Sequence, residues 1–222
     1  MVVDVVCVWK GQVINMSFKS FSDINEMHID VLREIANIGS GNAASSLSRM
    51  LDHRVNVAIP YIGIKGFNEA YEALGGADAV MVGTLLTISC DLQGMMMFLL
   101  PVDLACDLVN MLMYTDIKNY NEIDEIGFSA INEISNIMSG AFVGAIADMS
   151  TLKIDISPPE ATLDMLGSIM SVPSIYFAKM SDTLLLIQSD LEIAGERTRT
   201  SILLLPDMPS LEKLMKSLGI DT

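Results

Sequence analysis

The sequence predicts an α+β protein in which two similar halves share one continuous antiparallel sheet of about six strands. Three observations predict this class. A motif on a long helix of apolar periodicity occurs twice, a hairpin pattern follows each copy, and no linker rich in Pro or Ser lies near residue 118. Helices combined with hairpins favour an antiparallel sheet, and joining two three-stranded halves removes one raw edge from each. We therefore expect one globule with internal pseudo-two-fold symmetry.

The repeat is visible at an offset of 99 residues, and such a repeat can decide the whole fold. The aligned residues are Asp30, Glu34, Asn37 and Pro60 in the first copy, and Ser129, Glu133, Asn136 and Pro159 in the second. By Pro101 and Pro206 the offset has risen to 105, so the second half holds about six additional residues. Hairpin loops accept insertions at low cost, and we place these residues in the turn at 194–197.

In the first half, helical and alternating apolar patterns predict six elements. They are a helix over 23–51, a strand over 55–59 that Pro60 ends or bends, a short helix over 67–75, strands over 80–91 and 95–100, and a helix over 102–113. Asp23 with Glu26 resembles a capping pair at the start of the first helix.

The second half predicts the same order of elements. They are a helix over 122–149 that Asn121 caps, a strand over 153–157, a short helix over 160–168, strands over 183–193 and 198–205, and a helix over 207–218. The repeats thus cover about 23–114 and 122–219 of a single domain, 16–222. Residues 1–15 differ in character and precede a second plausible start at Met16, so we expect an extension or cloning remnant outside the fold.

Composition limits the function. Hydrophobic residues make up 51% of the 222 residues, enough for a sizeable core, and the net charge of −15 argues against binding nucleic acid. The longest uncharged stretches in the middle of the chain, Ile134–Ala147 and Met165–Ala178, have 14 residues. A membrane-spanning helix needs about 18 or more, so we interpret both stretches as core. The three cysteines lack a C-x-x-C motif, which fits a reduced cytoplasmic setting, and Cys90 and Cys106 are expected in the core.

Each long helix carries a Glu and an Asn three residues apart, Glu34 with Asn37 and Glu133 with Asn136. Residues at i and i+3 share a helix face, so each pair can touch one bound group. A single pair of this kind is common on solvated helices. Two copies, each followed by small residues and a matching proline, favour a functional pair. His28 and His53 have no neighbouring ligand pattern and do not indicate a metal site.

The doubled pattern Asp/Ser-x3-Glu-x2-Asn-x22-Pro resembles that of the CheC/FliY/CheX phosphatases of bacterial and archaeal chemotaxis, over about 16–222. It looks most like CheC, because both pairs are intact. The resemblance implies a hydrolase acting on the phospho-aspartate of the response regulator CheY. It implies that Asn37 and Asn136 orient the attacking water, while Glu34 and Glu133 hold the regulator's lysine. It implies no cofactor beyond the Mg²⁺ that the regulator itself carries.

The resemblance also implies a second partner, the receptor deamidase CheD, which in the family contacts a helix of the second half. Asp164, in the expected helix over 160–168, is the candidate contact; an ordinary solvated acidic residue is the alternative. Two other functions stay open for the whole chain. It can be a non-catalytic binding module for CheD or phospho-CheY, or a component of the flagellar switch.

Overall fold

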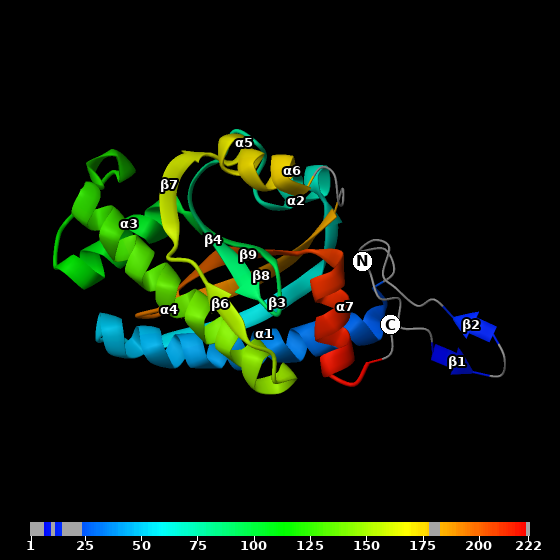
Figure 1. Ribbon diagram of the computed structural model, residues 1–222. Helices are drawn as coiled ribbons and strands as arrows, with labels where there is room; N and C mark the ends of the chain where they lie inside the picture. The colour runs from blue at the N-terminus through cyan, green and yellow to red at the C-terminus, as the bar shows by residue number, and fades with distance from the viewer. Residues whose placement is uncertain (1–6, 10–11, 15–23, 178–182, 221–222) are drawn as a thin grey trace.

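The computed structural model describes residues 7–9, 12–14, 24–177 and 183–220 (Figure 1). It consists mainly of a seven-stranded antiparallel sheet with helices on both faces, which confirms the α+β class and the sheet shared by both halves. In chain order the elements are α1 (Glu26–Leu51), β3 (Val55–Gly66), α2 (Phe67–Ala73), β4 (Val80–Cys90), β5 (Gly94–Pro101), α3 (Val102–Met113), η2 (Tyr120–Glu122), α4 (Glu125–Ser150), β6 (Ile154–Ile156), β7 (Glu160–Met165), α5 (Leu166–Ile169), α6 (Ser171–Phe177), β8 (Thr183–Ile193), β9 (Glu196–Pro206) and α7 (Met208–Ser217).

The two halves exchange their edge segments, which are β3 in the first half and β6 with β7 in the second. The sheet runs β3-β8-β9-β5-β4-β6, with β7 also paired to β4. Strand β3 of the first half therefore lies beside the hairpin of the second half, and β6 and β7 of the second half lie beside the hairpin of the first. The central pair, β5 with β9, joins the halves. Because of this exchange, each half pairs with the other at three places in the sheet and not only at one edge.

Helices cover the two faces of the sheet unequally. The larger apolar cluster lies between the sheet and helices α1, α3, α4 and α7, and it includes Leu32, Leu108, Ile134 and Leu214. The smaller cluster lies on the opposite face under α2 and α5, where Ala70 and Leu166 are fully buried. The two long helices thus share one face of the sheet.

The two long helices have equal length and similar starts. Helices α1 and α4 each span 26 residues, and their first residues lie 99 apart. Asn25 caps α1, accepting from the His28 backbone N–H while His28 Nδ1 accepts from the Asn25 N–H. Asp124, not Asn121, caps α4, because its carboxylate accepts from two N–H groups of the first turn. The expected cap Asp23 lies outside the described residues.

The expected helix over 160–168 is wrong in its first part. Residues Glu160–Met165 form strand β7, and helix begins only at Leu166. The repeat offset explains this, since α2 begins at Phe67 and 67 plus 99 is 166. Strand β7 is thus the counterpart of residues 61–66, where β3 continues past Pro60 instead of ending there.

Both halves have an irregularity at the matching prolines. On β3, Ala58 pairs with Asp190 and Tyr61 with Gln188, so one extra residue bulges out around Pro60. In the second half the extra residue falls between β6 and β7, which are separated by 157–159. Proline has no N–H for a strand ladder and favours such edge positions.

The six extra residues of the second half are divided between two places. Gly83 of β4 pairs with Leu99 of β5, and the equivalent pair in the second half is Leu185 of β8 with Leu204 of β9. The offset between the halves is therefore 102 residues on the first strand of the hairpin and 105 residues on the second. Three extra residues therefore lie in the hairpin. The other three extra residues lie before the hairpin, in the stretch that contains α6. The expectation that all six lie in the turn at 194–197 is therefore wrong.

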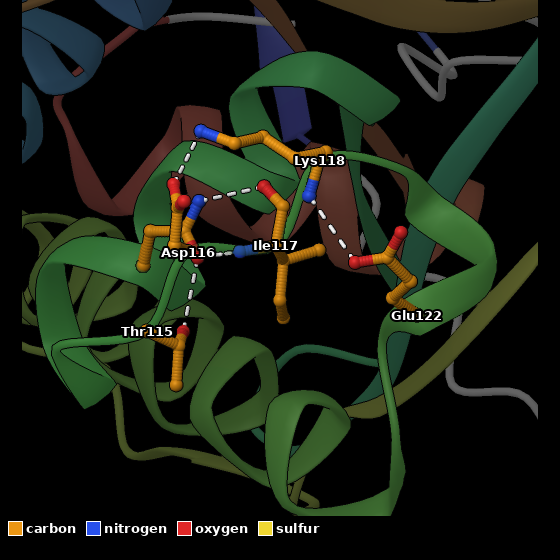
Figure 2. A network of polar contacts seen from close by, with 6 residues as sticks. Thr115, Asp116, Ile117, Lys118 and Glu122 are labelled. Atoms are coloured by element: carbon orange, nitrogen blue, oxygen red, sulfur yellow. Dashed lines mark hydrogen bonds and ion pairs between the residues drawn. The ribbon is translucent and has the colours of Figure 1, made fainter.

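A network of hydrogen bonds and an ion pair holds the segment between the halves, and Figure 2 shows its members from Thr115 to Glu122. Asn110 Oδ1 accepts from the Ile117 N–H at 2.7 Å and from the Thr115 hydroxyl at 2.9 Å, while Asn110 Nδ2 donates to the Ile117 carbonyl at 2.9 Å. Beyond it, the Lys118 N–H donates to Glu122 and the Lys118 ammonium contacts Asp116. The connection from α3 to α4 is therefore an ordered loop.

The described part of the N-terminal segment is a short hairpin, β1 (Cys7–Trp9) with β2 (Gln12–Ile14). Its strands pair with each other in a sheet of their own. That residues 1–15 are an extension stays a prediction. Among the helices that the structure describes, none is long and apolar enough to cross a membrane.

Candidate functional site

The four site residues predicted from the sequence lie on the outer faces of α1 and α4. Glu34, Asn37, Glu133 and Asn136 are all exposed. Within the described residues, none of their side chains has a hydrogen bond or an ion pair. Buried neighbours on the opposite side of each helix, such as Ile35 and Ile134 at 1% exposure, anchor the helices to the core. Each pair is therefore held on a rigid backbone with its polar groups free to meet another molecule.

The small residues that follow each pair have different roles. Gly39 lies where α1 meets α4, because an added Cβ would be 3.0 Å from the Phe142 Cα. Gly41 and Gly140 instead face open space, with nothing within 4 Å of an added Cβ. Each lies seven residues after its Glu, on the same helix face. Packing within this chain thus explains Gly39, and it does not explain the other two glycines.

Two serines of the small-residue runs are used within their own helices. The Ser40 hydroxyl donates to the Ala36 carbonyl at 2.6 Å, and the Ser139 hydroxyl donates to the Ser135 carbonyl at 2.7 Å. Both side chains are buried. The groups that each face offers to a ligand are therefore the carboxylate and the carboxamide.

Other reactive groups lie away from these faces. Cys106 is buried as expected, but Cys90 is exposed at the end of β4, where the strand leaves the core. The hydrogen bond from its Sγ to the Asp155 carboxylate raises the pKa of the Cys90 thiol, which disfavours the nucleophilic thiolate. No group of three or more His, Cys, Asp or Glu that could hold a metal ion occurs in the described ranges.

Asp164 lies on strand β7 and not on a helix, on the sheet face opposite α1 and α4. There it lines a cavity of about 300 Å³ together with Glu160, Thr162, Ile169 and Val172, among other residues. The sequence did not reveal the surface beside this cavity, because the whole stretch Met165–Ala178 was interpreted as core. Leu166 and Ile169 of α5 are indeed buried, whereas Val172 and Ile175 of α6 are 50% and 76% exposed. Pro173 was the available signal, because proline is tolerated in the first turn of a helix, and α6 begins two residues before it, at Ser171.

Comparisons with known proteins agree with this geometry. The model of the CheC-like family matches residues 27–62 and 126–163, two segments that begin 99 residues apart. The chain is 30% identical over 204 residues to the CheY-P phosphatase CheC of Bacillus subtilis (strain 168), covering 90% of this chain and 97% of that protein. It is 26% identical over 142 residues to the flagellar motor switch phosphatase FliY of the same strain, covering 64% of this chain and 37% of that protein.

Solved structures show the same fold. The crystal structure of Thermotoga maritima FliY has a TM-score of 0.73 at 20% identity, covering 88% of this chain and 98% of that chain. The FliM middle domain from H. pylori has a TM-score of 0.64 at 10% identity, covering 87% and 99%. The near full-length match to CheC and the two family segments on the helices with the Glu-x-x-Asn pairs lead to one conclusion: this chain belongs to the CheC-like family, and among its members it is most like CheC.

Proposed function

We propose that this chain hydrolyses the phospho-aspartate of a CheY-type response regulator at two Glu-x-x-Asn sites. The observation that carries the proposal is the doubled pair itself, exposed on two long helices and without hydrogen-bond partners among the residues that the structure describes. Homology to a named CheY-P phosphatase over 90% of the chain supports a chemotaxis phosphatase role. Such regulators act in the cytoplasm, which is the location that we propose for this chain.

The residue types suit this reaction. An acyl phosphate is already activated, and the regulator's own Mg²⁺ neutralises its charge, so the remaining task is to place a water in line with the P–O bond. A carboxamide can orient such a water by accepting from it and donating to it. We assign this role to Asn37 and Asn136. The water forms a new P–O bond as the bond to the aspartate oxygen breaks, the aspartate carboxylate leaves, and the proton of the water passes to the phosphate product. The Asn amides orient the water and exchange no proton.

The carboxylates serve as docking groups. Glu34 and Glu133 lie one helical turn before their Asn and are exposed, so each can pair with a lysine beside the regulator's phosphate. Gly41 and Gly140 lie one turn beyond the Asn, and their open faces let a partner's backbone approach the helix closely. A helix glycine is less favourable than Ala by about 1 kcal/mol, and a docking role gives a reason for keeping two of them.

The test is phosphate release from the phosphorylated cognate regulator in large excess over the chain. Wild type should clear the excess. The Asn37→Ala, Asn136→Ala double variant should fall by about 10²-fold or more, to the regulator's own rate, because the water is no longer aligned. If the double variant still accelerates release while remaining folded, the assignment to these residues is wrong.

The leading alternative is a binding module that sequesters the phosphorylated regulator without turnover. The same exposed faces would serve it. A chain that protects phospho-regulator only in stoichiometric amounts would support sequestration and contradict catalysis. A flagellar switch component is the weaker alternative, supported by the fold shared with FliY and FliM and by the 26% identity to FliY over 64% of this chain.

We further propose that CheD binds the second half at the surface formed by the cavity and helix α6. Asp164 and Glu160 give this cavity an acidic rim, and Val172 and Ile175 are exposed beside it. Exposed apolar side chains next to a hollow are typical of protein interaction surfaces. Ile175→Ser should weaken binding of purified CheD in calorimetry by about tenfold, and an unchanged affinity would place the contact elsewhere.

A further inference from the structure

The first turn of each long helix carries one large apolar side chain that the fold leaves exposed. Met27 on α1 is 63% exposed, and Ile126 on α4 is 59% exposed. Each is the second residue of its helix, and they are separated by the same 99 residues that relate the two Glu-x-x-Asn pairs. The residues that follow them, His28 and Gly127, turn inward and are buried. Neither apolar side chain is therefore part of the core.

These side chains lie on the same helix faces as the site residues. Met27 precedes Glu34 by seven residues, and Ile126 precedes Glu133 by seven. Seven residues are about two turns, or about 10 Å along the axis, with a drift of only about 20° around it. Asp30 and Ser129, both exposed, lie between them. Each face thus runs from an apolar residue through the Glu and Asn to an open glycine.

A single exposed apolar residue needs no explanation, but this one occurs twice at the same place. The two residues differ in type, so the halves share apolar bulk at this place and not residue identity. Ile38 is also exposed, at 39%, but its counterpart Ile137 is half-buried. The first-turn residue is therefore the large apolar group that both faces present. Interfaces place such groups beside charged and polar contacts, where they provide much of the binding energy.

We propose that Met27 and Ile126 are apolar anchors that position the phosphorylated receiver domain on each face. The proposal rests on the proposed function and extends it to residues outside the Glu-x-x-Asn motif. A carboxylate–lysine pair fixes one point of contact, and an apolar contact about 10 Å away fixes a second. Two points define the angle at which the helix crosses the acyl phosphate. The anchor also gives an acidic chain of net charge −15 a contact that salt does not screen.

The experiment compares the Met27→Ala, Ile126→Ala double variant with wild type in two assays. One assay is steady-state phosphate release as a function of regulator concentration. The other is the Kd for the regulator carrying beryllofluoride in place of the phosphoryl group, which needs no turnover. We expect KM and Kd to rise about tenfold with kcat within about twofold of wild type, because the anchors are remote from the reacting atoms.

Two controls accompany this variant. Met27→Leu with Ile126→Leu keeps the apolar bulk and should keep both constants near wild type. Met113→Ala removes a large side chain of 39% exposure from α3, away from both faces, and should change neither. If the double variant keeps the wild-type Kd and KM, the proposed anchoring role of Met27 and Ile126 is wrong. Absent turnover in wild type would instead overturn the proposed function, and the beryllofluoride Kd would still decide the anchors.

Discussion

The sites on α1 and α4 use the same motif in different surroundings. On α1 the leading Asp30 forms an ion pair with Arg33, which places a cation beside Glu34. On α4 the hydroxyl of the leading Ser129 donates to the Glu125 carbonyl at 2.9 Å. Asn132 stands at the position that corresponds to the arginine. Exposed ion pairs contribute little stability, so the difference concerns the partner more than the fold. The Glu, Asn and Pro of the motif are kept in both halves, whereas the leading residue and the flanking charge are not.

The single Asn variants test whether both halves work. Asn37→Ala and Asn136→Ala should each remove the turnover of one face, about 10²-fold at that face, and leave the other face intact. Their phosphate-release rates should therefore add up to the wild-type rate. The ratio of the two rates measures how far the halves have diverged. Loss of all activity in either single variant would mean that the two faces form one coupled site.

The connection between the halves offers a second contrast. Asn110 makes three hydrogen bonds to the loop after α3, whereas the residue 105 positions later, Met215, is a fully buried apolar residue. Asn110→Ala should lower the free energy of unfolding by about 1–2 kcal/mol, because the partly buried N–H and carbonyl of Ile117 lose their partner. Urea unfolding measures this. Thr115→Val removes one of the three bonds and should have a smaller effect; an equal effect would contradict the role of the amide.

The helix crossing gives a third contrast, between two glycines of α1. Gly39→Ala should destabilise the fold by about 1 kcal/mol, since the new methyl group would push against Phe142 at 3.0–3.2 Å. Gly41→Ala should stabilise it by up to about 1 kcal/mol, because nothing opposes the better helix former. Thermal unfolding of both variants measures the difference. If Gly41→Ala also slows phosphate release, the open face is part of the docking surface.

The smallest expected effect concerns the ends of α3 and α7. Tyr114 and Gly219, 105 positions apart, both adopt positive φ, at 54° and 78°. Glycine takes this conformation without strain, and tyrosine does not. Tyr114 is 89% exposed and loses few contacts on replacement, so Tyr114→Gly should stabilise the fold by up to about 1 kcal/mol. Gly219→Ala should destabilise it by a similar amount. Opposite signs in calorimetric Tm would confirm the contrast.

Local sequence patterns predicted most elements of the fold. The long helices, both hairpins and the helices after Pro101 and Pro206 lie within a few residues of their expected bounds. The errors lie where two patterns compete. Residues 160–165 alternate in exposure as a strand does, but they were assigned to a helix because the repeat offset was not applied to them. Asn121 and Asp124 are both good caps, and only the position of the first helical turn decides between them.

The site was predictable to a different degree. Glu34, Asn37, Glu133 and Asn136 were found from spacing, because a helix of known period puts i and i+3 on one face. Their exposure was not determined by spacing, and neither was that of Met27 and Ile126. An apolar residue in the first turn of a helix is more often core than surface. Only the spatial neighbours of Met27 and Ile126 show that no described residue covers either side chain.

The sequence by itself determined the repeat, the order of elements and the shared face of each Glu and Asn, because these depend on local period and offset. The tertiary structure decided which strands pair. No strand's own sequence predicts that β3 is exchanged with β6 and β7 between the halves. The alternation of apolar residues in each of these strands would allow it to pair with either hairpin. The structure also decided that Gly39 meets Phe142 while Gly41 faces solvent. Contacts between segments far apart in the chain settle such choices, and these contacts exist only once the sheet has formed.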